Sequence, residues 1–290
     1  MSKLLARFAI SLLSLCMFGA SQPLCAQGRL AIIIDDIGYN LELGKRSADL
    51  SGAFTLAILP FTPHGIELAE RAHQRGKEIM LHAPMSNRHN YPLGRGGLVS
   101  GMQRAEFLAV LRQNLANIPY IKGVNNHMGS LLTEQAEPMH WLMEELKTRQ
   151  LYFVDSRTSA HTQALLMAEQ IHLPSRKRDV FLDDERSPTA IRYQLLRALK
   201  QAQQQGSAIA IGHPYPETLA QLEQLQPLLQ QHQVQLVSAS QLMSAVQAKR
   251  EAGLGLVPGT ALACQAPPMG LWPQIWAPVD PFADVGIAEW

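Results

Sequence analysis

The feature that most constrains the fold is the alternation of short apolar runs with longer stretches that carry apolar residues at helical spacing. The apolar runs lie at residues 30–35, 54–59, 77–82, 121–127, 151–155, 178–183, 207–213 and 234–238. Runs that are apolar on both faces are typical of parallel strands covered by helices. Helical patterns follow at residues 62–76, 105–119, 137–150, 190–206, 215–232 and 238–250. This alternation predicts an α/β fold with a parallel sheet, and the number of repeats favours a closed barrel over an open sheet.

The first 26 residues have the pattern of an export signal. Lys3 and Arg7 precede an apolar stretch, and the best cleavage point follows Ala26. We therefore expect a signal peptide at 1–26 and a periplasmic or secreted mature protein with no stable membrane insertion, an uncleaved anchor being the alternative. Cleavage would remove two of the 3 cysteines and leave only Cys264, which excludes a disulfide framework within the mature chain.

Composition and missing motifs exclude other classes of function. The formal net charge is +1 and only 17% of residues are charged, so no basic surface for nucleic acid is indicated. No glycine-rich phosphate-binding motif follows any apolar run, so nucleotide binding has no support. We expect one barrel domain over residues 27–249 and an extended or disordered tail, rich in proline and glycine, over 250–290. The sequence carries no signal for an oligomeric state.

One long loop stays open to two interpretations. Residues 87–101 contain turn-forming residues throughout. The loop either forms part of a substrate groove or is a surface excursion with no role in binding.

Polar and ionisable residues gather where the apolar runs end. In parallel α/β folds these ends converge on one mouth, where ligands bind. Imidazole and carboxylate are the usual ligands of a zinc ion that keeps one position open for water. The pattern therefore predicts one divalent metal ion, with zinc expected, among residues drawn from Asp35, Asp36, His82, Asn125, Asn126, His127, Asp155, Asp183, Asp184 and His213.

The adjacent carboxylates Asp35 and Asp36 are the most unusual part of this set. Two neighbouring carboxylates repel each other unless a cation, a proton or water intervenes. A metal bound by one of them would let the other stay ionised and act as a base. The structural alternative is that one carboxylate caps the following turn while the other faces water.

The other polar residues also have structural alternatives. His127 falls in a polar break whose side chains could bond their own backbone. Asp155 and Arg157 suit either a contact with a substrate hydroxyl or acyl group, or a buried ion pair. Asp183 suits either a hydrogen bond that orients a histidine or an anchor for its loop.

Five segments resemble motifs of the divergent polysaccharide deacetylase family. They are IIIDDIGYN (32–40), GKEIMLHAPMS (76–86), GVNNHMGS (123–130), FVDSRTS (153–159) and IAIGHPYPETL (209–219). The resemblance covers roughly residues 29–247, in order, with each motif at a strand end. It implies a distorted (β/α) barrel of about seven parallel strands and a carbohydrate substrate.

The resemblance also implies roles for individual residues. Asp36 corresponds to a metal ligand, Asp35 to the catalytic base and His213 to the general acid. His82 corresponds to the first metal histidine of the family. The family's second metal histidine would fall four residues later, where this chain has Ser86.

His127, from the next strand end, is the natural substitute for that missing ligand. The implied reaction is then metal-assisted N-deacetylation of an acetylated glycan, with a metal-bound water as nucleophile. The residues expected to contact substrate or to orient a histidine are Asn126, Asp155, Arg157 and Asp183.

Two other functions compete with this hypothesis. The serine at position 86 suggests a glycan-binding protein on the same barrel without turnover. An aspartyl-phosphate receiver or phosphatase also uses acidic residues after the first strand. The export signal argues against a receiver, and Ile37 breaks the Asp-x-Asp pattern of the phosphatases.

Overall fold

The computed structural model describes residues 27–243. The expected signal peptide (1–26) and tail (250–290) lie outside the described residues, as does the second half of the helix expected over 238–250. A helical turn begins at residue 239 and continues to residue 243, the last one described. Within the described range, no helix is both long and apolar enough to cross a membrane.

Strands and helices alternate along the chain as expected. They are β1 (Gly28–Ile37), α1 (Leu41–Asp49), β2 (Thr55–Ile58), α2 (Gly65–Gln74), β3 (Glu78–Met85), α3 (Arg104–Asn117), β4 (Ile121–Met128), the 3₁₀ helix η1 (Leu132–Glu134), α4 (Ala136–Thr148), β5 (Tyr152–Asp155), α5 (Ala164–Gln170), β6 (Ser175–Lys177), β7 (Val180–Phe181), α6 (Pro188–Gln205), β8 (Ser207–Gly212), α7 (Pro216–Glu223), α8 (Leu225–Gln231) and β9 (Val234–Leu236).

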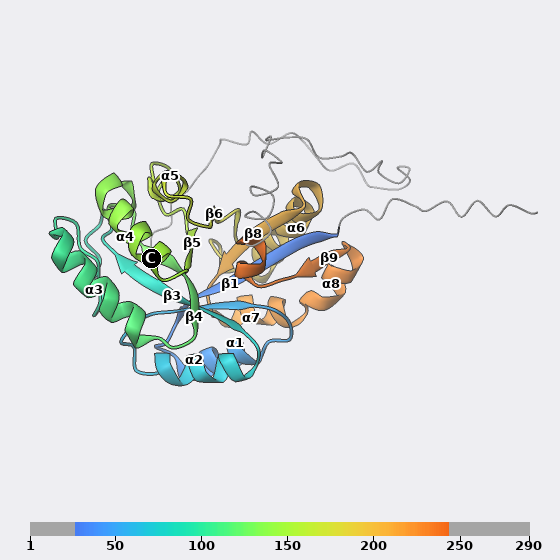
Figure 1. Cartoon of the computed structure of the whole chain (residues 1–290). Coiled ribbons are helices and arrows are strands. Elements are labelled where there is room, and N and C mark those ends of the chain that lie inside the picture. Colours follow the sequence, from blue (N-terminus) through green and yellow to red (C-terminus); the bar gives the residue numbers. More distant parts are fainter. Residues whose placement is uncertain (1–26, 244–290) are drawn as a thin grey trace, which may run out of the picture.

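The strands form one curved parallel sheet with the helices on its outer side (Figure 1). Its order is β6-β5-β4-β3-β2-β1-β8-β7, and β9 pairs with the first residues of β1. Every strand pair is parallel. The predicted α/β fold with a parallel sheet is confirmed.

A single short segment contacts both ends of the sheet and curls it into a partial barrel. β6 pairs with β5, whereas β7, which is separated from β6 by two residues, pairs with β8. Between them, Arg178 N donates to Asp155 O and Asp179 N donates to Ile209 O, both at 2.8 Å. With β6 and β7 taken as one segment, the ring matches the distorted barrel of about seven strands that was expected.

The α-helices depart from the expected ones in three places. Helices α1 and α5 were not predicted, although Asn40 caps α1 by accepting a hydrogen bond from Leu43 N. The helix expected over 215–232 is two helices, because the ring of Pro227 excludes a helical carbonyl at Glu223, four residues earlier, where α7 ends.

Two hydrophobic cores lie on opposite faces of the sheet, and this division positions the polar residues. One core includes helix side chains and the strand residues Leu30, Ile32 and Ile34. The other contains no residue of α1 to α8 and fills the barrel interior. Because neighbouring residues of a strand point to opposite faces, the interior is lined by every second strand residue, including Ala31, Ile33, Met80, Tyr152, Val154, Ile209 and Ile211.

Candidate metal centre

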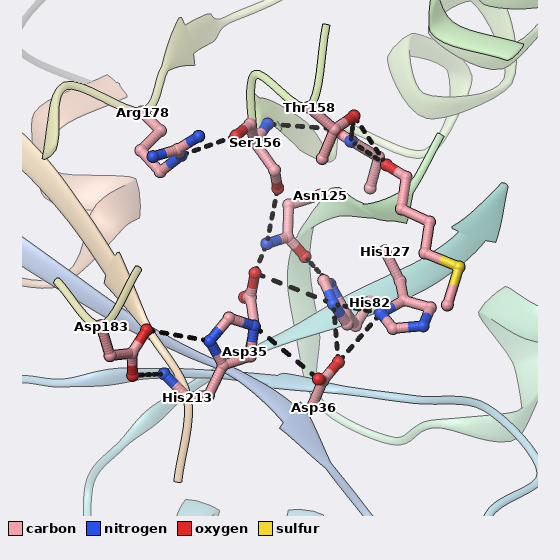
Figure 2. Close-up of polar contacts among 12 residues, drawn as sticks. Asp35, Asp36, His82, Asn125, His127, Ser156, Thr158, Arg178, Asp183 and His213 are labelled. Carbon is pink, nitrogen blue, oxygen red and sulfur yellow. Dashed lines mark hydrogen bonds and ion pairs between the residues drawn. The ribbon is translucent and has the colours of Figure 1, made fainter. Parts of the chain in front are cut away.

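The interior-facing positions become polar at the C-terminal ends of the strands. Counting in twos from the interior core leads to Asp35 on β1, His82 on β3 and His213 just after β8. Their side chains face one another (Figure 2). The mouth expected from the sequence is therefore present, with three of the predicted site residues on it.

Asp36 reaches the same mouth because the strand is irregular at that point. A regular strand would send Asp35 and Asp36 to opposite faces. Asp36 instead has φ +56°, a left-handed conformation that aspartate tolerates better than most residues. The pairing of β1 with β2 is also irregular between Ile34 and Ile37. This local break allows two consecutive carboxylates to share one site.

The three predicted metal ligands lie together. Single ligand atoms of Asp36, His82 and His127 all lie within 4.8 Å of one another. Asp36 Oδ1 is 2.9 Å from His127 Nδ1 and 3.2 Å from His82 Nε2, and the two nitrogens are 3.2 Å apart. The Asp36 side chain is 33% exposed, so the cluster is accessible from solvent.

The hydrogen bonds of Asn125 determine which nitrogen of His82 faces the cluster with a lone pair. Asn125 Nδ2 donates to Asp35 Oδ1 at 2.8 Å, which leaves Asn125 Oδ1 as an acceptor. His82 Nδ1 lies 2.8 Å from that oxygen and must donate to it. In the neutral ring, Nε2 then presents a lone pair to Asp36 Oδ1, as a metal-binding histidine does.

This arrangement fits a cation. Asp36 Oδ1 is buried and has no hydrogen bond of normal geometry, although two histidine nitrogens lie near it. Burial would raise the pKa of Asp36, but His127 and His82 outweigh it and hold that pKa well below the usual value. Burial would lower the pKa of His82, but Asp35 and Asp36 outweigh it and raise that pKa. The Asp36 carboxylate is therefore ionised, the form that binds a metal, and the two carboxylates favour positive charge at His82.

Asp35 has the properties of a buried base. The residue is 3% exposed. Burial raises the pKa of Asp35, while the charges of His82 and His213 and the hydrogen bond from Asn125 oppose the increase. A carboxylate with a raised pKa is a stronger base, which suits general base catalysis near neutral pH.

His213 is held by a buried carboxylate. Asp183 Oδ1 lies 3.0 Å from His213 Nδ1, and Asp183 Oδ2 accepts from His213 N at 2.6 Å and from Thr218 Oγ1 at 2.8 Å. His213 Nε2 points to the cluster, 3.7 Å from Asp36 Oδ2. Burial alone would lower the pKa of His213, but the bond to Asp183 and the charges of Asp36 and Asp35 raise it to about 9.

Three other predicted residues lie away from the cluster. Asn126 bonds backbone instead, donating to Met128 O at 2.7 Å and accepting from Ser156 N at 2.9 Å. Asp155 is fully buried and accepts from Arg157 N at 2.8 Å. Asp155 shares its strand face with Phe153 of the outer core, so it points away from the barrel interior. Arg157 contacts Asp155 through its backbone N–H, and its φ is +56°.

Ser86 is also used elsewhere, at the base of the loop 87–101. Its Oγ accepts from Ser100 N at 3.0 Å, and its carbonyl accepts from Leu131 N and Leu132 N. Position 86 therefore contributes to loop structure, and His127 is the third member of the cluster with Asp36 and His82.

Asn125 is the functional residue that the sequence analysis did not assign. It bridges His82 and Asp35 and lies 3.3 Å from Ser156 Oγ (Figure 2). The alternation of side chains along a strand could have indicated this role, because residue 125 shares a strand face with His127 and residue 126 does not.

Comparison with known proteins identifies the family. The model of the divergent polysaccharide deacetylase family matches residues 32–243. The chain belongs to this family. The resemblance found from the five motifs is thereby confirmed. The match begins within β1 and ends at the last described residue, so it includes every residue of the candidate centre.

Relatives of this deacetylase family member include proteins without an assigned activity. "Uncharacterized protein YibQ" of Escherichia coli (strain K12) is 38% identical over 231 residues, covering 80% of this chain and 72% of that protein. An uncharacterized protein of Haemophilus influenzae (strain ATCC 51907 / DSM 11121 / KW20 / Rd) is 35% identical over 198 residues, covering 68% and 71% respectively.

A solved structure supports the fold. The crystal structure of uncharacterized protein ATU2773 from Agrobacterium tumefaciens C58 covers 74% of this chain and 89% of its own, with 24% identity and a TM-score of 0.71. That likeness shows a shared fold.

Proposed function

We propose that this protein is an exported, metal-dependent hydrolase that removes N-acetyl groups from an acetylated glycan. One observation carries the proposal. Ligand atoms of Asp36, His82 and His127 converge within 4.8 Å, next to a buried carboxylate with a raised pKa and a histidine with a raised pKa. This combination, in a chain of the divergent polysaccharide deacetylase family, suits hydrolysis of an amide.

The donor set favours zinc among divalent cations. Two imidazole nitrogens and one carboxylate oxygen match the protein ligands of catalytic zinc sites, which leave a further position open. When bound, the cation would polarise the acetamide carbonyl and increase the acidity of the attacking water. Asp36, His82 and His127 would hold it, and Asn125 would keep the Nε2 lone pair of His82 directed inward.

Asp35 and His213 supply the proton transfers. Asp35 removes a proton from the attacking water as its oxygen adds to the acetamide carbon. His213 Nδ1 donates to Asp183, and because the pKa of His213 is raised to about 9 the ring also carries a proton at Nε2 at neutral pH. It gives that proton to the amine nitrogen as the C–N bond breaks. The products are acetate and a free amine on the sugar.

Acetate release from chitin and peptidoglycan fragments tests the proposal. The zinc-loaded wild-type protein should release acetate, and Asp35→Asn should lose roughly 10²–10⁴-fold of that activity. Asp184→Asn is the matched control, because it makes the same change at an exposed aspartate and should retain the activity.

The same assay separates the glycan-binding alternative. Tight binding of these fragments without acetate release, with any divalent metal, would contradict the proposed hydrolysis and select a binding protein on the same barrel. Loss of activity in Asp184→Asn equal to that in Asp35→Asn would contradict the role of Asp35 as base.

A further inference from the structure

The loop 87–101 is firmly held at its start. Asn87, only 2% exposed, accepts hydrogen bonds from His89 N at 3.1 Å and Tyr91 N at 2.9 Å, and its Nδ2 donates to Tyr91 O at 3.1 Å. The same Nδ2 lies 3.0 Å from the sulfur of Met128. Met128 follows His127, so the turn that carries Tyr91 is fixed directly to the strand end of the candidate metal centre.

The rest of the loop is anchored as well. Leu98 N donates to Pro84 O at 2.8 Å, and Ser86 N donates to Leu98 O at 3.0 Å. Asn114 of α3 donates to Gly96 O at 2.7 Å. Gly96 has φ +88°, and a Cβ there would lie 2.3 Å from Asn114 Oδ1, so only glycine fits this close approach. These bonds hold the loop in a defined conformation.

Two exposed tyrosines lie on the segments that follow the strands of the metal centre. Tyr91 is 46% exposed and Tyr39 is 62% exposed. Tyr39 lies three residues after Asp36, and its hydroxyl approaches the loop, 3.3 Å from where a Cβ on Gly94 would lie. The rings thus come from the two segments that follow β1 and β3, the strands that carry Asp36 and His82.

A sugar ring matches this surface chemically. A pyranose has apolar C–H faces and a polar edge of hydroxyl groups, and aromatic rings bind such faces while leaving the edge in water. Arg95, fixed with its guanidinium 4.3 Å from the centre of the Phe61 ring, adds hydrogen-bond donors on the same loop. A rigid surface also loses little conformational entropy on binding.

We propose that Tyr39 and Tyr91 form a binding site for a second pyranose ring of the glycan, adjacent to the ring that is deacetylated. This inference rests on the proposed function for the identity of the ligand. It implies a preference for oligomeric over monomeric substrates, set by the loop 87–101 and independent of the metal ligands.

Binding of β-1,4-linked N-acetylglucosamine oligomers of increasing length tests the site. Calorimetric titration in the zinc-loaded Asp35→Asn background avoids turnover. Affinity should rise about tenfold at the length that first reaches the two tyrosines, the gain expected of one aromatic stacking contact. Tyr39→Ala and Tyr91→Ala should each remove most of that gain, whereas Tyr91→Phe, which keeps the ring, should preserve it.

Tyr193→Ala is the matched control, because Tyr193 is 49% exposed on α6 and lies outside this loop. It should bind all oligomers as the parent does. The proposal is overturned if affinity does not depend on length, if both alanine variants keep the gain, or if Tyr193→Ala loses it equally. A length-dependent gain without acetate release by the wild type would overturn only the hydrolysis, and acetate release without a gain would overturn only this binding site.

Discussion

At the scale of single residues, the candidate centre depends on one backbone angle and one amide. The left-handed conformation of Asp36 places its carboxylate beside that of Asp35, and Asn125 fixes the tautomer of His82. The sequence could predict which residue types gather at the strand ends. It could not predict the angle, because aspartate adopts a positive φ only where the surrounding structure requires it.

The bridging role of Asn125 predicts a loss of metal affinity on truncation. Asn125→Ala leaves His82 Nδ1 and Asp35 Oδ1 without their partner, so the ring orientation is no longer fixed. Zinc affinity should fall roughly 10- to 100-fold, measured by competition with a chromophoric chelator.

Asn126→Ala is the control for this variant. Its amide bonds backbone groups of Met128 and Ser156, so its removal should cost about 1–3 kcal/mol of unfolding free energy and leave zinc affinity nearly unchanged. Equal losses of zinc affinity in the two variants would contradict the assignment of Asn125 to the centre.

The contact between Asp183 and His213 predicts a change in pH dependence. Asp183 raises the pKa of His213, and a general acid loses activity as pH rises through its pKa. Asp183→Asn removes the negative charge, so the basic limb of the kcat/KM profile should move to lower pH than in the wild type. An unchanged basic limb, in a variant with a normal unfolding temperature, would contradict His213 as the acid.

At the scale of elements, the strands were predictable and the short connections were not. The run 178–183 was expected as one strand, but the chain there divides between β7 and the link from β6. Ser175, Arg176 and Lys177 form β6 although none of them is apolar, because pairing with β5 outweighs their weak intrinsic preference. Helix α5 is only seven residues long, too short for a clear helical period.

Helices α3 and α4 are joined by an ionic contact that predicts a pH-dependent stability. Arg112 on α3 binds Glu145 on α4 at 2.8 Å, and Arg149 binds it at 2.7 Å. Arg112 lowers the pKa of Glu145 against the effect of burial, and Arg149 adds to the decrease. Because the folded-state pKa is below the unfolded one, this stabilisation is present above the unfolded pKa and lost as pH falls through the folded value.

Glu145→Gln should therefore cost about 1 kcal/mol of unfolding free energy at pH 7, and the cost should shrink in acid below the unfolded pKa. Urea unfolding at several pH values measures it. Glu144→Gln, which affects a more exposed pair with Arg104, should cost less at neutral pH. A loss for Glu145→Gln that does not change with pH would contradict this account.

At the scale of the whole molecule, the barrel brings together segments that are far apart in the sequence. The rule that parallel strand ends converge predicted that Asp36, His82 and His127 lie at one mouth, and the family resemblance supplied their roles as ligands. The rule could not choose between Asn125 and Asn126, nor show that Asp155 points to the outer core, because both depend on which face of a strand each residue takes. Once the interior core is known, the alternation of side chains along each strand shows which face Asn125, Asn126 and Asp155 take.

The central claim is that these three side chains hold one cation, and anomalous scattering from a zinc-soaked crystal tests it most directly. Data on both sides of the zinc edge should give a single strong peak per chain, about 2.0–2.2 Å from an Asp36 carboxylate oxygen, His82 Nε2 and His127 Nδ1. The peak should vanish in His127→Ala. No peak at this position, or a peak that persists in His127→Ala, would contradict the account.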